Sequence, residues 1–299
     1  MSGSTVTHRT DETVSGDARP PSTNPGRGKR VTYGATDVRR RRRWRVPTLV
    51  RRAVVPILLV TVWQIGSDQG WWDSEVLSSP LEVAREFGNL IENGQLPDNL
   101  AVSLRRAMLG AFFGIGTGTI LGVAVGLWRP VEEALDATVQ MMRTVPFLVL
   151  LPLFVLWFGV DELPKIMIIS IGTALPMYLN ASSGVRTVDP KLLEMGEQFG
   201  LNRLQVITTI VLPGAMPSLL TGLRYSLGIS WLALVVAEQI NAQQGLGYLL
   251  SAAQVQFQTT VVLVVVVVYA ILGLLTDAVV RLAEWRLLAW RHDPRGRKR

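Results

Sequence analysis

The stretch EMGEQFGLNRLQVITTIVLP, residues 194–213, has the spacing of two short helices, although long apolar segments flank it on both sides. Asp189 can cap the first helix, which then has Pro190 at its first position. Gly200 suits the left-handed stop that ends such a helix, and the second helix is expected to run until Pro213 interrupts it. A folded loop between two apolar segments indicates a membrane protein that presents a structured unit outside the bilayer.

Three apolar side chains, Leu192, Met195 and Phe199, recur at helical intervals and form one stripe on the first loop helix. Such a stripe on an exposed loop suggests that it binds in a groove of a partner protein. The alternatives are a plain connector and a DNA-reading helix-turn-helix. A connector needs no cap, stop or stripe, and Glu194 and Glu197 would repel the phosphates of DNA. We therefore expect a protein partner and no nucleic acid.

The composition is typical of a polytopic membrane protein. Of 299 residues, 48% are hydrophobic and only 18% are charged, and the charges gather in the tails and loops. Because the chain has no cysteine, disulfides, thiolate metal sites and cysteine nucleophiles are excluded. The only histidines, His8 and His292, lie in the polar tails, which disfavours a histidine-based metal site inside the fold.

Six segments approach the roughly 20 apolar residues that a helix needs to cross a hydrocarbon core. They lie near residues 50–67, 105–128, 139–160, 164–184, 212–237 and 258–281. The sequence therefore predicts an all-α, polytopic membrane protein with about six transmembrane helices that lies in the lipid bilayer.

Basic residues set the expected orientation, because lysine and arginine are retained on the cytoplasmic side. The N-terminal flank contains the run RRRRRWR at 39–45, and the C-terminal flank is also basic, so both termini are predicted to be cytoplasmic. The loop of residues 68–99 is acidic and should face outward. Arg105 and Arg106 break the rule, and we expect them to snorkel to the outer headgroups.

A short amphipathic helix is expected in this acidic loop. Ser79, Pro80 and Glu82 form a cap, a first-turn proline and a capping-box acid ahead of the apolar residues Phe87 and Leu90. The helix would lie along the outer interface, either to shield the bundle or to dock a partner.

Small residues and prolines mark the second, third and fourth spans. The second span has glycines at 110, 114, 118, 122 and 126, and this period of four lets another helix backbone approach closely. Pro146 and Pro152 in the third span and Pro176 in the fourth remove helical hydrogen bonds. These prolines are either walls or hinges of a pathway, or adjustments of packing.

The loop motif is similar to one known family motif. Glu194, Gly200, Ile210, Leu212 and Pro213 have the spacing of the EAA loop of bacterial ABC importer permeases. The chain resembles that family from about residue 77 to residue 290, with supporting stretches that include LSSPLEV at 77, LPLFVLWFG at 151 and VAEQINAQQGLGYL at 236. Within the family it resembles the branch that imports aliphatic sulfonates, taurine, nitrate or thiamine precursors.

The chain departs from the motif where Met195 and Gly196 replace two alanines. Gly196 should cost the first loop helix roughly 1 kcal/mol relative to alanine. We expect a partner to hold that helix in shape.

The resemblance implies a type I, MetI-like permease core in the plasma (inner) membrane. The expected parts are a disordered basic cytoplasmic tail (1–46), a first transmembrane helix with the outer amphipathic segment (47–103), a permease core (104–285) containing a cytoplasmic coupling loop (186–213), and a basic cytoplasmic tail (286–299). Its function would be to form the pathway for a small solute.

The resemblance also implies partners. A permease homodimer would form the pathway, a cytoplasmic ABC ATPase dimer would bind the loops, and an extracytoplasmic binding protein would deliver the solute. The chain has no GxxxxGK[ST] loop, so ATP would be bound by the partner and this chain would have no cofactor and no enzyme activity. A secondary transporter is the alternative, and would be expected to show broken helix pairs and buried carboxylates.

The site residues follow from the motif and from the few polar groups in the spans. The coupling residues implied by the resemblance are Leu192, Glu194, Met195, Gly196, Phe199, Gly200, Ile210, Leu212 and Pro213. The pathway candidates are Pro146, Pro152, Arg224 and Glu238. Arg224 could meet an anionic solute, snorkel or pair with Asp277, and Glu238 has the same ambiguity.

Overall fold

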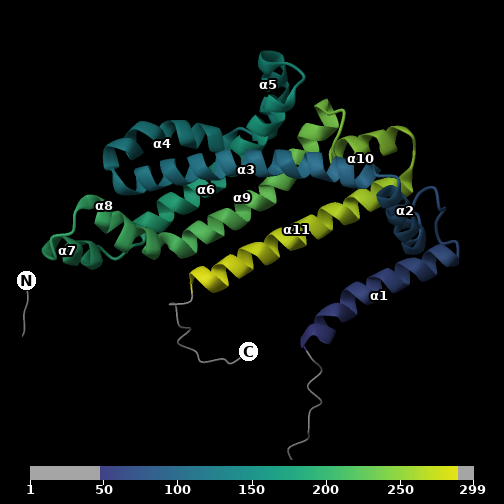
Figure 1. Ribbon diagram of the computed structural model, residues 1–299, viewed down its shortest axis with the longest axis horizontal. Helices are drawn as coiled ribbons and strands as arrows, with labels where there is room; N and C mark the ends of the chain where they lie inside the picture. Colours follow the sequence, from purple (N-terminus) through teal and green to yellow (C-terminus); the bar gives the residue numbers. More distant parts are fainter. Residues whose placement is uncertain (1–47, 289–299) are drawn as a thin grey trace, which may run out of the picture. The chain divides into compact units, whose positions relative to one another are not determined.

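The computed structural model describes residues 48–288, and within this range every regular element is helical (Figure 1). This confirms the all-α prediction for the described part of the chain. The predicted N-terminal tail, residues 1–46, lies outside the described residues, as do residues 289–299 of the predicted C-terminal tail.

The helices follow one another through short connections. In chain order they are α1 (Thr48–Asp68), α2 (Pro80–Glu92), α3 (Gln95–Leu127), α4 (Arg129–Thr144), η1 (Phe147–Leu150), α5 (Leu151–Phe158), α6 (Glu162–Arg186), α7 (Pro190–Gln198), α8 (Arg203–Val206), η2 (Ile207–Val211), α9 (Leu212–Asn241), α10 (Leu246–Val255) and α11 (Thr259–Leu287). The element η1 is a 3₁₀ turn and η2 is a π-helical turn.

Four helices in the described residues are long and apolar enough to cross a membrane. They are α3, α6, α11 and the continuous helix Arg203–Ile240, which joins α8, η2 and α9. The first predicted span, 50–67, lies within the 21-residue helix α1. With the bent pair described next, the count rises to five at most.

The third predicted span, 139–160, is not one continuous helix. Ala137–Thr144 and Phe147–Phe158 meet at an angle of 90°. The break lies at Val145, which has an extended backbone and directly precedes Pro146. The proline ring disfavours the helical conformation of the residue before it. Pro152 lies in the first turn of α5, where its missing N–H costs no hydrogen bond, whereas Pro176 lies inside α6.

The glycine stripe of α3 lies against α6, as the packing interpretation predicted. A Cβ atom added at Gly110 would lie 2.5 Å from Ile169 Cβ, and one added at Gly122 would lie 2.6 Å from Tyr178 O. The glycines therefore let the two helix backbones approach closely. Since α6 also packs against α9, these three helices form a tight central layer (Figure 1).

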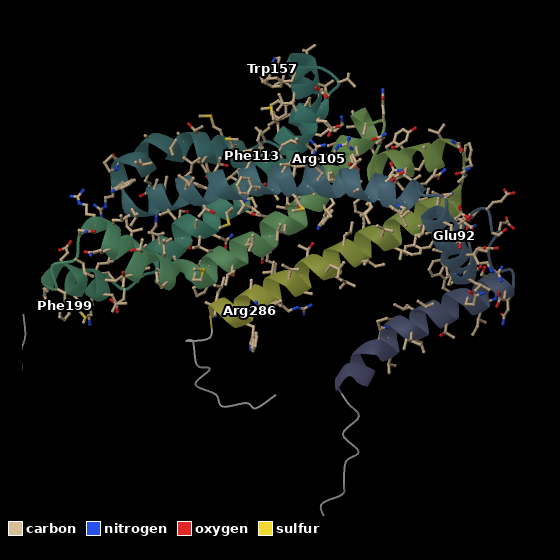
Figure 2. All side chains as sticks on the ribbon, in the orientation of Figure 1. Glu92, Arg105, Phe113, Trp157, Phe199 and Arg286 are labelled. Atoms are coloured by element: carbon tan, nitrogen blue, oxygen red, sulfur yellow. The ribbon has the colours of Figure 1, made fainter. Side chains whose placement is uncertain are left out.

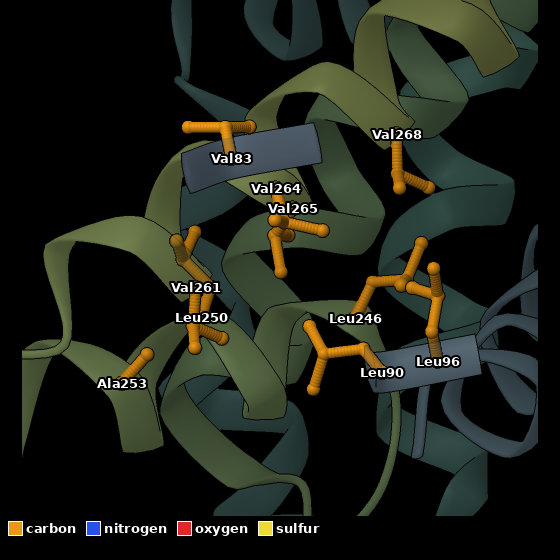
Figure 3. Close-up of a cluster of buried hydrophobic side chains, with 10 residues drawn as sticks. All are labelled: Val83, Leu90, Leu96, Leu246, Leu250, Ala253, Val261, Val264, Val265 and Val268. Carbon is orange, nitrogen blue, oxygen red and sulfur yellow. The ribbon is translucent and has the colours of Figure 1, made fainter. Parts of the chain in front are cut away.

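The predicted amphipathic helix is present as α2. The Ser79 backbone N–H donates to Glu82 Oε2 at 2.8 Å, and the Glu82 N–H donates to Ser79 Oγ at 3.2 Å, so the capping box is formed. Val83 and Leu90 are buried in a cluster with residues of α3, α10 and α11 (Figure 3). This contact favours the shielding role of α2 over a docking role.

Candidate functional site

The α7–α8 unit, residues 189–206, forms the folded loop that the sequence predicted. Asp189 caps α7, since its side chain accepts a hydrogen bond from the Lys191 N–H at 3.0 Å. Val188, just before the cap, is buried in a cluster against which Leu193 also packs, so the two form the expected hydrophobic staple. Together they fix the direction in which the chain enters α7.

The turn after α7 depends on Gly200. Its φ is +72°, in the left-handed region that favours glycine. The Gly200 N–H donates to Glu197 O and the Leu201 N–H donates to Gly196 O, both at 3.0 Å, which satisfies two carbonyls at the helix end.

The second loop helix begins as predicted but does not end as predicted. Asn202 and Gln205 form a capping box, with bonds of 2.8 and 2.9 Å. The prediction that Pro213 interrupts this helix is wrong. A π turn precedes the proline, with the Leu212 N–H donating to Ile207 O, and the helix continues into α9. Because Pro213 lies in the first turn of α9, the wider π turn can accommodate a residue that has no N–H.

The departure at Gly196 has a packing reason that sequence reasoning missed. Gly196 is buried, and a Cβ atom there would lie 2.8 Å from Ile210 Cδ1. The glycine thus lets α7 pack closely against the π turn. The structure therefore brings Gly196 and Ile210 of the predicted motif into contact.

The apolar stripe is exposed. Leu192, Met195 and Phe199 have exposed fractions of 47%, 49% and 79%, and Figure 2 shows Phe199 projecting from this unit. Leu204, at the start of the second loop helix, is a further exposed apolar residue of this unit. Because it lies beyond the glycine turn, it does not share the helical spacing of the α7 stripe. Glu194 is exposed and has no ion pair within the described residues.

Glu238 is fully buried and lies at the centre of a polar cluster with Ser103, Arg106 and Glu162, here called the Glu238 cluster. Ser103 Oγ donates to both Glu238 oxygens at 2.8 Å, and Arg106 NH1 donates to Glu238 Oε1 at 2.8 Å. Arg106 also forms a two-bond contact with Glu162, at 2.7 and 2.6 Å. The Gly247 N–H, at the start of α10, donates to Glu238 Oε2 at 2.9 Å.

The prediction that Arg106 snorkels is therefore wrong. Only 4% of Arg106 is exposed, because two carboxylates hold it inside the bundle, whereas Arg105 is exposed (Figure 2). Sequence reasoning also missed Ser103 and Glu162, since the polar partners come from α3, α6 and α9 and share no local pattern.

Of the three alternatives for Arg224, which were contact with a solute, snorkelling and an ion pair with Asp277, the structure shows the ion pair. Arg224 Nε lies 3.3 Å from Asp277 Oδ1, and its NH2 group lies 2.8 Å from Glu284 Oε2. Both carboxylates belong to α11, so Arg224 joins α9 to α11. These pairs favour a structural role over contact with a solute.

Pro146 and Pro176 line one cavity of about 480 Å³ at the break between α4 and η1, here called the break cavity. Its walls are mostly apolar and come from α4, η1, α6 and α9. They are formed by Met141, Met142, Arg143, Thr144, Val145, Pro146, Phe147, Leu150, Ile171, Gly172, Leu175, Pro176 and Ile229. Pro152, the other proline predicted for the pathway, is exposed and lies outside this wall.

The sequence is similar to those of transport permeases. The protein of Bacillus subtilis named putative aliphatic sulfonates transport permease protein SsuC is 40% identical over 243 residues, which are 81% of this chain and 88% of that protein. The Escherichia coli protein of the same name is 43% identical over 236 residues, 79% of this chain and 90% of that protein. The taurine transport system permease protein TauC of Escherichia coli is 35% identical over 84% of this chain and 94% of that protein.

Solved structures show the same fold. An amino acid ABC transporter with histidines matches with a TM-score of 0.55 and 16% identity, over 67% of this chain and 97% of that chain. An inward-facing structure of the MetNI methionine ABC transporter matches with a TM-score of 0.51 and 20% identity, over 60% of this chain and 92% of that chain. Residues 114–288, which include the α7–α8 unit, the break cavity and the glycine stripe from Gly114 onward, match the family described as binding-protein-dependent transport system inner membrane component. The chain therefore belongs to this family and is a permease subunit of an ABC importer.

Proposed function

We propose that this permease imports an aliphatic sulfonate and that the α7–α8 unit couples it to a separate ATPase. The solute class is supported by the SsuC proteins, at 40% and 43% identity, and by TauC at 35%. Taurine is itself a short sulfonate, so the solutes named for these relatives share an anionic sulfonate group on a small organic molecule.

The observation that carries the coupling role is the exposed apolar surface of α7. Leu192, Met195 and Phe199 leave large apolar areas uncovered on a short capped helix, and such a surface fits the groove of a partner protein. The partner's groove would bury these side chains, while Glu194 would make polar contacts at its rim.

The path from this surface into the membrane is short. Gly196 packs against Ile210 in the π turn, and the same helix continues without a break to Ile240. A displacement of α7 would therefore reach the spanning part of α9 through direct packing. In this mechanism, ATP is bound and hydrolysed by the partner, and this chain converts the partner's movement into a change of its pathway.

The expected assembly follows from the family and the charge pattern. Two copies of this chain would form the pathway in the plasma membrane, with both termini in the cytoplasm and the acidic segment 68–99 outside. The cytoplasmic ATPase dimer would bind the two α7–α8 units, and an extracytoplasmic binding protein would deliver the sulfonate to the outer face.

The test is an affinity purification of the tagged permease from its native membrane. We expect a nucleotide-binding subunit to accompany the wild type and to be lost from the triple variant Leu192→Ser, Met195→Ser, Phe199→Ser. These side chains are exposed, so the variant should insert and fold normally.

A matched control replaces three exposed apolar residues elsewhere, Val76, Val255 and Phe257, with serine. This control should retain the ATPase. A stably inserted triple variant that still retains the ATPase would contradict the coupling role of α7, and the absence of an ATPase from the wild type would contradict the transporter mechanism.

A further inference from the structure

We propose that the break cavity is the solute site of the permease, with Arg143 binding the sulfonate head and the apolar wall covering the alkyl chain, a proposal that rests on the solute class proposed above. The cavity volume of about 480 Å³ lies within the range of small-molecule sites. Neither the loop motif nor the glycine stripe contributes a side chain to it.

The break cavity lies near the middle of the spanning helices. Gly172 is ten residues after Glu162, the first residue of α6, so it lies about 15 Å along the helix at about 1.5 Å per residue. Ile229 lies near the middle of α9. Since the hydrocarbon core is about 30 Å thick, a cavity lined by both residues lies near its centre.

Its wall fits an alkyl chain. Phe147, Ile171 and Ile229 come from η1, α6 and α9 and give the cavity an apolar lining. The Phe147 ring lies directly on Gly172, where an added Cβ atom would be 2.7 Å from the ring. Glycine at position 172 thus lets the Phe147 ring lie close against α6, where it does not fill the cavity.

Arg143 gives the cavity its charge. It is the one charged residue among the residues that line the break cavity, it is exposed, and no carboxylate of the described residues pairs with it. An arginine facing hydrocarbon at this depth is costly, so it must face water, a partner group or a solute. A guanidinium offers a planar set of donors that matches the oxygens of an anionic head.

A polar cavity of about 410 Å³ elsewhere in the described residues has no such unpaired cation. Arg106 and Lys165 line it, but Arg106 is held by Glu162 and Glu238. Lys165 Nζ donates to Asp161 O at 2.8 Å and lies 3.7 Å from Glu162 Oε1. Carboxylates therefore occupy the positions that an anion would need, and the break cavity is the better anion site.

The first experiment measures sulfonate binding to the purified permease–ATPase complex without the binding protein, by isothermal titration calorimetry, and ATP-driven uptake by proteoliposomes that contain the full system. We expect Arg143→Gln to raise the Kd of the complex about tenfold or more and to lower uptake similarly, because one charge-assisted bond is lost. Arg143→Lys should restore part of both. Arg129→Gln is the matched control, since Arg129 is an exposed arginine of the same helix outside the cavity, and it should leave both values unchanged.

The second experiment tests the apolar wall with a series of probes from ethanesulfonate to octanesulfonate. Ile229→Phe should fill part of the cavity and reduce uptake of the longest probes about tenfold while leaving ethanesulfonate nearly unaffected. Ile229→Val is the control of smaller volume and should retain the long probes. A purely structural defect would reduce all chain lengths equally.

The outcomes separate the two proposals. If the wild type transports sulfonates and Arg143→Gln binds and transports them equally well, the break cavity is not the site, although the solute class stands. If Ile229→Phe lowers all probes alike, or if the cavity holds a tightly bound phospholipid that sulfonates do not displace, the assignment is also overturned. If the wild type neither binds nor transports any sulfonate, the solute class itself is overturned and the site assignment with it.

Discussion

In the Glu238 cluster, Arg106 and Glu238 are almost fully buried and find all their partners within the chain, whereas on α7 Met195 and Phe199 are exposed beside Glu194, which has no ion pair in the described residues. The first region gains nothing from another protein, because its charges are already compensated. The second leaves apolar surface in contact with solvent, which another protein can bury. Mutations in the first region should therefore change the stability of the chain, and mutations in the second should change its assembly.

The largest effect is expected from Glu238→Ala. This change leaves Arg106 and Ser103 without their buried acceptor, so the free energy of unfolding should fall by roughly 3–5 kcal/mol. Thermal unfolding of the detergent-solubilised full chain measures it. Glu194→Ala is the control and should not change the unfolding temperature, since Glu194 is exposed. Equal stabilities of the two variants would contradict the comparison.

The next largest effect is expected in the central layer that connects the two regions. In Gly118→Val the new side chain would collide with the backbone of α6 at Ala174, and overpacking of this kind costs about 1–3 kcal/mol. Gly116→Val, on the same helix, places its side chain in open space and should be tolerated. The same thermal unfolding measurement compares them, and similar losses in both variants would show that the stripe is not a packing surface.

A smaller effect on stability, but a clear effect on coupling, is expected from Gly200→Val. A β-branched residue at φ +72° costs about 1–2 kcal/mol in this turn, although no atom lies near enough to clash. The orientation of α7 should change, so ATP hydrolysis should continue while uptake falls. Parallel assays of hydrolysis and uptake in proteoliposomes test this, with Gly200→Asn as a tolerated control. Undiminished uptake by Gly200→Val would refute the role of the turn.

The smallest effect is expected from Gly196→Ala. The helix should gain up to about 1 kcal/mol in propensity, but the Cβ atom must displace the terminal methyl group of Ile210. Because that methyl group is the end of a flexible side chain, we expect a net change below about 1 kcal/mol in thermal unfolding. A loss above about 2 kcal/mol would show that the contact between α7 and the π turn is rigid.

Much of the fold could be predicted because it depends on local patterns. The Ser79 and Asp189 caps, the Gly200 stop and the glycine period of α3 each act within a few residues, and all are present. The sequence indicates that Pro146 disturbs the third span but not that the bend reaches 90°, and the prediction that Pro213 interrupts the second loop helix is wrong. In both cases a proline was visible, but the surrounding packing decides whether it breaks the helix or is accommodated by a π turn.

The candidate site was less predictable than the fold. The residues predicted to couple to an ATPase follow one another in a single loop, so their spacing is visible in the sequence. The Glu238 cluster and the break cavity combine residues from helices that are far apart in the chain, and neither Glu162 nor Arg143 stands out by its neighbours. Such groups become recognisable only when the helices are placed together.

The glycine stripe of α3 has a consequence for the interpretation of mutational scans. At Gly110, Gly114, Gly118, Gly122 and Gly126 even one additional carbon atom meets another helix, so nearly every substitution there will be selected against. None of these positions lines the break cavity. A map of substitution tolerance would therefore show its lowest tolerance on a helix face that only packs against another helix. Arg143, if lysine can replace it, would tolerate more substitutions than these glycines, although it is the residue proposed to bind the solute.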